Sequence, residues 1–246
     1  MTATSTRSAR GRSDRRPPRT ETAPLGAPLF VLNLKTYPSA LGPRALAIAT
    51  ELAYAGHEAG VAVAIAPSTP ELARVVAAVP IPVLAQHVDP GTPGPSTGHV
   101  PVPALVAAGV RGSLVNHSEH PLPFPKIAAV VGGLGDAGLA AVVCARDPAA
   151  TRRLAALRPP YVAIEPPALI GGPRAVSTAK PEIVVEGVRA AHGVSPGTHV
   201  LCGAGIRARE DVRKALELGS EGVLVASAVA LAPQPRRAIE ELLSGF

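Results

Sequence analysis

Aromatic residues are scarce in this sequence of 246 residues, which contains three Phe, three Tyr and no Trp. Since hydrophobic residues still make up 47% of the chain, the core must be built from aliphatic side chains. Cysteine is scarce too. Cys144 and Cys202 stand far apart with no ligand at paired spacing, which argues against a disulfide framework and against a zinc site.

Long apolar runs are also missing. No segment has the length and continuous apolarity of a membrane span, and the N-terminal region has no apolar stretch of the signal-peptide type. We therefore expect a cytoplasmic protein with no membrane partner. Residues 1–27 lack aliphatic periodicity and are rich in Arg, Ser, Thr and Pro, which predicts a disordered basic extension before a single domain at residues 28–246.

The positive charge of the chain is unevenly distributed. The formal net charge is +6, but residues 1–28 hold six Arg against two acidic residues, which is a net +4. Only +2 remains for the other 218 residues. The folded part is nearly balanced, so we expect no nucleic-acid partner.

Short apolar runs alternate with longer amphipathic stretches along the chain. The runs predict eight strands, at residues 28–34, 61–67, 81–87, 112–117, 139–145, 161–165, 198–203 and 222–227. The stretches between and after them predict helices at 43–59, 69–78, 101–108, 125–137, 147–157, 178–192, 207–218 and 234–244. Eight such units favour a (β/α)8 barrel, and a doubly wound open sheet is the alternative.

Polar residues follow several of these strands, where the chemistry of a barrel collects. They are Asn33 and Lys35, His87 and Asp89, His117 and Glu119, and Glu165. An acid, an imidazole, a cation and an amide at one mouth can move protons next to a carbonyl. Small residues follow the last two strands, at 202–205 and 226–227, where backbone N–H groups can face a phosphate.

Seven short motifs occur in a characteristic order: NLK (33–35), AQHVDP (85–90), TGH (97–99), NHSE (116–119), EPPALIGG (165–172), CGAGI (202–206) and GVLVAS (222–227). Together they make residues 28–246 resemble the triosephosphate isomerases, in particular the compact archaeal branch of that family. The resemblance implies a homo-oligomer, a dimer or a tetramer, that isomerises a triose phosphate with no cofactor and no metal.

The same resemblance implies roles for individual residues. Glu165 would be the base that moves a proton between adjacent carbons, and His117 the electrophile that polarises the carbonyl. Asn33 and Lys35 would bind the substrate and stabilise the enediolate. Backbone groups of four further residues would contact the phosphate: Ile170, Gly205, Ala226 and Ser227.

The segment after Glu165 has the features of a lid. Pro166 keeps Glu165 out of the helical region and, with Pro167, stiffens the chain that follows it. An apolar start and the pair Gly171-Gly172 suit a loop that closes over a ligand.

The residues after His117, namely Ser118, Glu119 and Pro121, predict a helix start there. The positive end of that helix would favour a neutral imidazole. His120 stands where many relatives have Arg, so an ion pair between such an Arg and Glu119 is not expected.

Each candidate also has a structural interpretation. Glu165 alone could be a strand-end acid in an ion pair, and His117 alone a core histidine or a helix cap. Glu119 is interpreted as a supporting residue. His87, Asp89 and His99 are assigned to loop and subunit contacts. For the whole chain, two alternatives are an isomerase of another short phosphosugar, such as a tetrulose phosphate, and a phosphosugar-binding barrel without catalysis.

Overall fold

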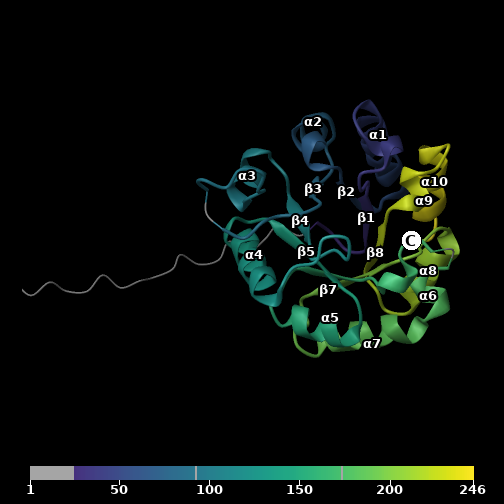
Figure 1. The fold of residues 1–246 in the computed structure, drawn as a ribbon. Helices are drawn as coiled ribbons and strands as arrows, with labels where there is room; N and C mark the ends of the chain where they lie inside the picture. Colours follow the sequence, from purple (N-terminus) through teal and green to yellow (C-terminus); the bar gives the residue numbers. More distant parts are fainter. Residues whose placement is uncertain (1–24, 92, 173) are drawn as a thin grey trace, which may run out of the picture.

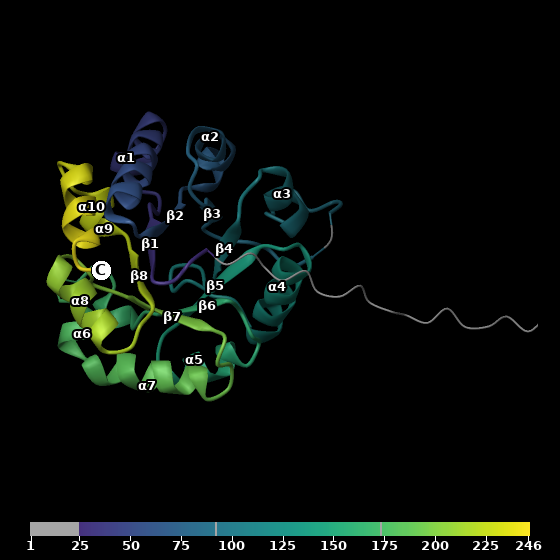
Figure 2. The same cartoon turned by 180° about the vertical axis from the view of Figure 1, so that it is seen from behind.

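Eight parallel strands form the centre of the molecule and helices form a ring around them (Figure 1). The computed structural model describes residues 25–91, 93–172 and 174–246. The strands are β1 (Leu29–Asn33), β2 (Ala62–Ala66), β3 (Leu84–Ala85), β4 (Gly112–Val115), β5 (Ala140–Ala145), β6 (Tyr161–Ile164), β7 (His199–Gly203) and β8 (Gly222–Val225). All eight predicted strands are present, and the view from behind shows the same ring (Figure 2).

The helices follow the predicted order. They are α1 (Pro43–Ala59), α2 (Leu72–Ala78), α3 (Val102–Ala107), α4 (Phe124–Asp136), α5 (Pro148–Ala155), α6 (Val176–Ala179), α7 (Pro181–His192), α8 (Arg209–Glu217), α9 (Ser227–Ala230) and α10 (Pro235–Leu243). The helix predicted at 178–192 is divided, because Lys180, which precedes Pro181, leaves the helical region at φ −148° and ψ 61°.

The sheet order is β2-β1-β8-β7-β6-β5-β4-β3, and each of these neighbouring pairs is parallel. A parallel bridge between Ile65 and Val83 joins the two outer strands, which makes the sheet a nearly closed barrel. The predicted (β/α)8 barrel is confirmed and the open sheet is excluded. The third strand is much shorter than the predicted 81–87: only Leu84 and Ala85 pair with β4, and Pro82, which has no N–H group to donate, lies just before them.

The core has two layers, and both are mainly aliphatic as predicted. The barrel interior is filled by small and branched side chains with one aromatic ring, Tyr161; its members include Leu29, Val31, Ala64, Leu84, Leu114, Val142, Ala163 and Leu201. A larger cluster lies between the strands and the helices. Because the interior is packed with side chains, the barrel is no pore.

Contacts with the barrel begin before the predicted domain boundary at residue 28. Leu25 is buried, and its N–H group donates a hydrogen bond of 2.9 Å to the Tyr161 hydroxyl. That hydroxyl in turn donates to the Gly26 carbonyl over 3.1 Å. Residues 25–27, which we predicted to be part of the extension, therefore belong to the start of the domain. Residues 1–24 lie outside the described residues.

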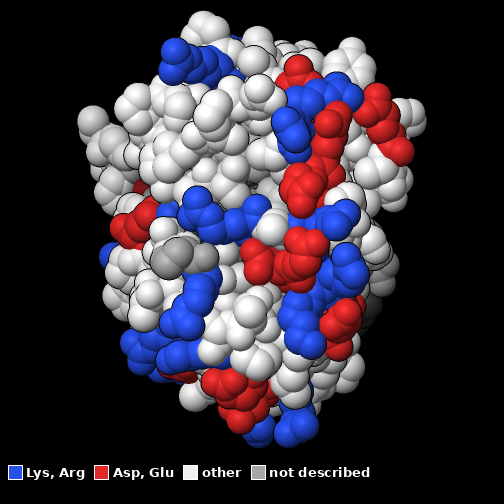
Figure 3. Space-filling model, turned by 90° about the vertical axis from the view of Figure 1, so that its right-hand side faces the viewer, with Lys and Arg blue, Asp and Glu red and all other residues white. Residues whose placement is uncertain are grey.

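Charges of both signs are mixed on the side of the molecule that bears α8 and α10 (Figure 3). Arg236 of α10 illustrates the pattern, since its guanidinium contacts Glu51 and Glu58 of α1 at 3.1 and 2.8 Å, and Glu240 at 2.6 Å. Exposed pairs contribute little one by one, but this set links the last helix to the first.

None of the helices in the described residues is long and apolar enough to cross a membrane.

A pair of glycine variants tests the packing of the strands. A Cβ atom at Gly112 would press on the Ala140 carbonyl of the neighbouring strand, whereas one at Gly132 in α4 would meet nothing within 4 Å. Gly112→Ala should lower the free energy of unfolding by about 1–3 kcal/mol. Gly132→Ala should raise it by about 0.5–1 kcal/mol, because the backbone loses less entropy. Urea unfolding of both variants checks this, and an equally stable Gly112→Ala protein would contradict the packing described.

Candidate active site

The first strand places an amide and a cation at the carboxyl end of the barrel. Asn33 is the last residue of β1 and is buried, and its Oδ1 accepts a hydrogen bond of 3.0 Å from the Lys35 N–H group. This bond holds Lys35 at a φ of 49°, a conformation that L-residues rarely adopt. Strained backbone of this kind is common where side chains must be aimed at a ligand.

Lys35 is fixed by two further contacts. Its ammonium pairs with Glu119 Oε1 at 2.5 Å, and its carbonyl accepts a hydrogen bond of 2.9 Å from Gln86. The Lys35 side chain is 11% exposed, whereas that of Glu119 is 58% exposed. The pair therefore holds a nearly buried cation from its solvent side, and the supporting role of Glu119 in the reaction stays a prediction.

His117 follows β4 and is 6% exposed. Its Nδ1 accepts a hydrogen bond of 3.2 Å from the Glu119 N–H group. An accepting nitrogen carries no proton, so this contact assigns the ring proton of the neutral imidazole to Nε2. Nε2 lies 3.6 Å from Glu165 Oε2.

The predicted helix start at His117 is wrong. Residues 118–120 form a turn, in which the His120 N–H group donates to the His117 carbonyl over 2.8 Å, and α4 begins only at Phe124. Pro123, in an extended conformation, caps that helix, and Pro125 stands in its first turn. The contact from the Glu119 amide, and not a helix dipole, is what leaves Nδ1 of His117 unprotonated.

Glu165 directly follows β6, and only 6% of it is exposed. Burial raises the pKa of its carboxyl above the usual 4.5, against the opposing effects of His117, the Cys144 thiol and Lys35. Oε2 has no hydrogen-bond partner among the described residues. The group is thus a buried carboxylate with one free oxygen.

Gly203 makes room for that carboxylate. Ile164 pairs with Cys202 in the ladder, so Glu165 stands level with Gly203 on β7. A Cβ atom at Gly203 would come within 2.5 Å of Glu165 Cγ and 2.8 Å of Oε1. Any side chain there would displace the carboxylate.

A small cavity of about 30 Å³ brings the predicted residues together. The four polar candidates Asn33, Lys35, His117 and Glu165 line it, and so do the predicted phosphate contacts Ile170, Gly205, Ala226 and Ser227. Gly171 of the predicted lid also lines it, whereas Pro166, Pro167 and Gly172 do not. Ser227 is the first residue of α9, where backbone N–H groups lack helical partners.

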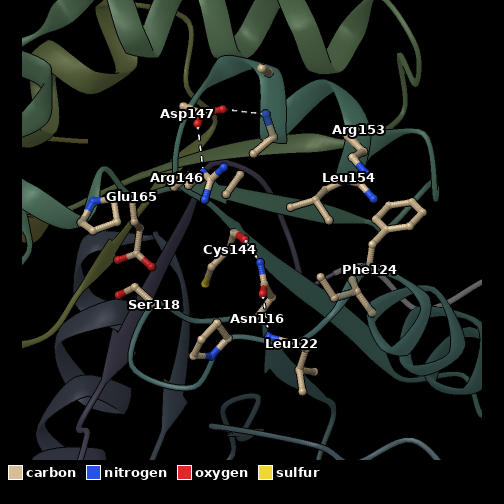
Figure 4. Close-up of a pocket in the computed structure, with 16 residues that line it drawn as sticks. Asn116, Ser118, Leu122, Phe124, Cys144, Arg146, Asp147, Arg153, Leu154 and Glu165 are labelled. Atoms are coloured by element: carbon tan, nitrogen blue, oxygen red, sulfur yellow. Dashed lines mark hydrogen bonds and ion pairs between the residues drawn. The ribbon is translucent and has the colours of Figure 1, made fainter.

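A second, larger cavity of about 580 Å³ lies on the other side of Glu165, against α4 and α5. Figure 4 shows Glu165, Ser118 and Cys144 close together at one side of it, and Arg146 joined to Asp147. Neither Lys35 nor His117 lines this cavity. Glu165 is therefore the residue that borders both spaces, and only the small cavity combines it with an imidazole and a cation.

The three residues assigned to loop contacts lie beside the site. His87 Nε2 is 3.2 Å from Asp89 Oδ1, and both line a cavity of about 520 Å³ with His99, next to Lys35 and Glu119. In residues 25–91, 93–172 and 174–246, no three His, Cys, Asp or Glu side chains are grouped so as to hold a metal ion.

Four residues of the site were missed from the sequence: Tyr37, which lines the small cavity, Gln86, Cys144 and Gly203. Gln86 and Cys144 stand near strand ends, as the predicted residues do, so their position was the available signal. Nothing in the local sequence distinguishes Gly203 from a turn glycine.

Comparison with known proteins agrees with this geometry. The family model described as triosephosphate isomerase matches residues 28–242. The triosephosphate isomerase of Methanothermus fervidus is 45% identical over 217 residues, which cover 88% of this chain and 98% of that protein. Those of Methanosarcina acetivorans and Methanocaldococcus jannaschii are both 43% identical, over 89% and 87% of this chain and 99% and 98% of their own lengths.

Burial of Glu165 predicts a pH-dependent stability. The Glu165 carboxyl keeps its proton to a higher pH in the folded protein than in the unfolded chain. The contribution of this protonation to the free energy of unfolding is therefore lost as pH rises from about 4.5 through the folded pKa. Glu165→Gln removes this titration. The free energy of unfolding of the variant should therefore rise relative to wild type between pH 4 and 8, by at most about 1.4 kcal/mol per pH unit.

Urea unfolding at several pH values measures the effect. The exposed Glu241→Gln is the matched control and should show a constant difference from wild type. If Glu165→Gln also shows a constant difference across this range, the carboxyl is not perturbed as described.

Proposed function

Because the chain belongs to the triosephosphate isomerase family and is an isomerase with a TIM-barrel fold, we propose that it interconverts dihydroxyacetone phosphate and glyceraldehyde 3-phosphate through an enediolate. Neither a metal nor a cofactor takes part in this proposal. One observation carries it: a buried carboxylate, an imidazole and an ammonium line a single small cavity.

Glu165 is the proposed base. A carboxylate whose pKa is raised by burial binds a proton more readily, which suits the abstraction of a weakly acidic C–H proton. The same carboxyl then returns the proton to the adjacent carbon, so the reaction needs no second acid for the carbon atoms. Its free oxygen, Oε2, is the atom that would meet the substrate.

His117 is the proposed electrophile. With its proton on Nε2, the imidazole can donate a hydrogen bond to the carbonyl and hydroxyl oxygens of the substrate. Nε2 lies 3.6 Å from Glu165 Oε2, so both groups face the same reacting atoms. A neutral donor matches the weak acidity of an enediol better than a cation does.

Lys35 supplies the positive charge that an enediolate requires. Its ammonium is nearly buried, where its interaction with a developing anion is weakly screened. Asn33 fixes the strained backbone of Lys35 through its side-chain oxygen. Together they would bind the substrate as its charge develops.

The lid would close over the phosphate. Ile170 and Gly171 of the lid line the cavity together with Gly205 and Ser227. The far end of the lid is joined to the loop after β7, since the Val176 N–H group donates to the Ala204 carbonyl over 3.1 Å. Closure excludes water, which would otherwise weaken the electrostatic interactions and permit loss of phosphate from the intermediate.

The preference for a three-carbon substrate over a tetrulose phosphate is supported by the relatives, which are named triosephosphate isomerases. The cavity of about 30 Å³ has to widen for any sugar phosphate to bind, so its volume does not distinguish the two substrates. We further propose that the protein is a cytoplasmic homo-oligomer, a dimer or a tetramer, to which the 89–99 loop contributes contacts. Light scattering of the purified protein measures the number of copies.

Replacement of the base tests the reaction. Glu165→Gln should lower kcat for triose phosphates by about 10²–10⁴-fold, because the amide cannot take up the proton. Glu241→Gln should keep the wild-type rate. A coupled assay with triose and tetrose phosphates measures both substrates. A triose rate that survives Glu165→Gln refutes the mechanism, and a faster wild-type rate on a tetrose phosphate refutes the substrate assignment.

Replacement of Gly203 tests the position of the base. Gly203→Ala should displace the carboxylate, and a shift of about 1 Å can cost on the order of 10²-fold in rate. The loss should appear in kcat more than in KM, because the phosphate contacts are untouched. Gly197→Ala, whose Cβ would meet nothing within 4 Å, is the control. Equal kcat values for the two variants would show that Gly203 does not set the carboxylate position.

A further inference from the structure

Two imidazole rings stack beside the active site. The rings of His87 and His120 lie with their centroids 3.7 Å apart and their planes 9° from parallel. His87 stands just past β3, and its side chain is 14% exposed, whereas His120 is an exposed residue of the turn after β4. The stack thus links the end of β3 to the turn after β4. In the sheet itself, only two residues of β3 pair with β4.

The turn that carries His120 also positions two groups of the proposed reaction. Within it, the Glu119 amide donates to His117 Nδ1 and the Glu119 carboxylate pairs with Lys35. The His120 N–H group closes the turn by its bond to the His117 carbonyl. A movement of this turn would therefore shift the imidazole and release the ammonium at the same time.

His87 is held from its other side. Its Nε2 contacts Asp89 Oδ1 at 3.2 Å, and Asp89 Oδ2 accepts a hydrogen bond of 2.8 Å from the Val100 N–H group. Although burial acts in the opposite direction, the Val100 amide and His87 lower the pKa of Asp89. His87 is consequently a fixed support against which the His120 ring can rest.

The charged groups around the stack come from three segments. Asp89 and His99 face it from the loop between β3 and α3, Lys35 from the end of β1, and His117 and Glu119 from its own turn.

We propose that His120 is a positioning residue of the isomerase: stacked on His87, it holds the turn 117–120 against the end of β3 and so fixes the His117 ring and the Lys35–Glu119 pair. This inference rests on the proposed isomerisation.

Two substitutions at residue 120 test whether the stacked ring holds the turn. His120→Phe keeps a planar ring but cannot be protonated, and His120→Ala removes the ring. Because the residue is exposed, both variants should fold, which melting temperatures within a few degrees of wild type confirm. The control is His57→Phe, at an exposed position on the C-terminal end of α1, at the other end of the barrel.

Rates on triose phosphate at pH 8 give the first readout. His120→Ala should lower kcat about tenfold with little change in KM, whereas His120→Phe, which keeps a stacking ring, should keep the wild-type rate. The control His57→Phe should also keep the wild-type rate. Wild-type rates in His120→Ala, or an equal loss in both variants at residue 120, would overturn the proposal.

The ¹⁵N spectrum of His117 gives a readout that does not depend on activity. Loss of the stack should weaken the bond from the Glu119 amide to Nδ1, so the Nδ1 and Glu119 amide resonances should move in His120→Ala and not in His120→Phe. Unmoved resonances in His120→Ala would refute the positioning role. If wild type itself has no rate on triose phosphate, the proposed function fails, and this spectrum still decides whether His120 holds the turn.

Discussion

Burial of the Glu165 carboxylate is the constraint on which the rest of the site depends. A charge removed from water is unfavourable unless partners compensate for it, and here His117 after β4 and Lys35 after β1 oppose the rise in the Glu165 pKa that burial causes. Space for the carboxylate comes from Gly203, which the β6–β7 register places level with it. The strand register, the missing side chain of Gly203 and the neighbours His117 and Lys35 thus act together. A change to any of them changes the position or the pKa of the Glu165 carboxylate.

Backbone strain is concentrated at the carboxyl ends of the strands, around the small cavity that Glu165 lines. Of the four non-glycine residues with positive φ in the described part of the chain, three are at strand ends of the site: Lys35, Asn116 and Ala204. Each is held by neighbours. Asn116, for instance, donates to the Cys144 carbonyl and accepts from the Leu122 amide. The packed layers of the barrel fix the backbone on either side of these residues, and this packing stabilises their unfavourable φ angles.

The sequence predicted the parts of the fold that local patterns encode. The alternation of apolar runs located all eight strands, and polar residues at their ends identified the four groups that line the small cavity. Contacts between distant segments were not predictable in this way. The pairing of Lys35 with Glu119 joins residues 84 positions apart, and the stack of His87 on His120 depends on a turn that resembled a helix start. The length of β3 was overestimated, because apolarity indicated a strand over residues 81–87 whereas only Leu84 and Ala85 pair with β4.

The hydrogen bonds between Tyr161 and Leu25-Gly26 fix where the chain enters the barrel. Tyr161 is the first residue of β6, so these bonds lie at the amino ends of the strands, whereas the small cavity lies at their carboxyl ends. The polypeptide that precedes Leu25 thus joins the domain on the floor of the barrel, away from its mouth. For a protein attached to a surface or fused to another domain through its amino terminus, this geometry leaves the mouth facing the solution.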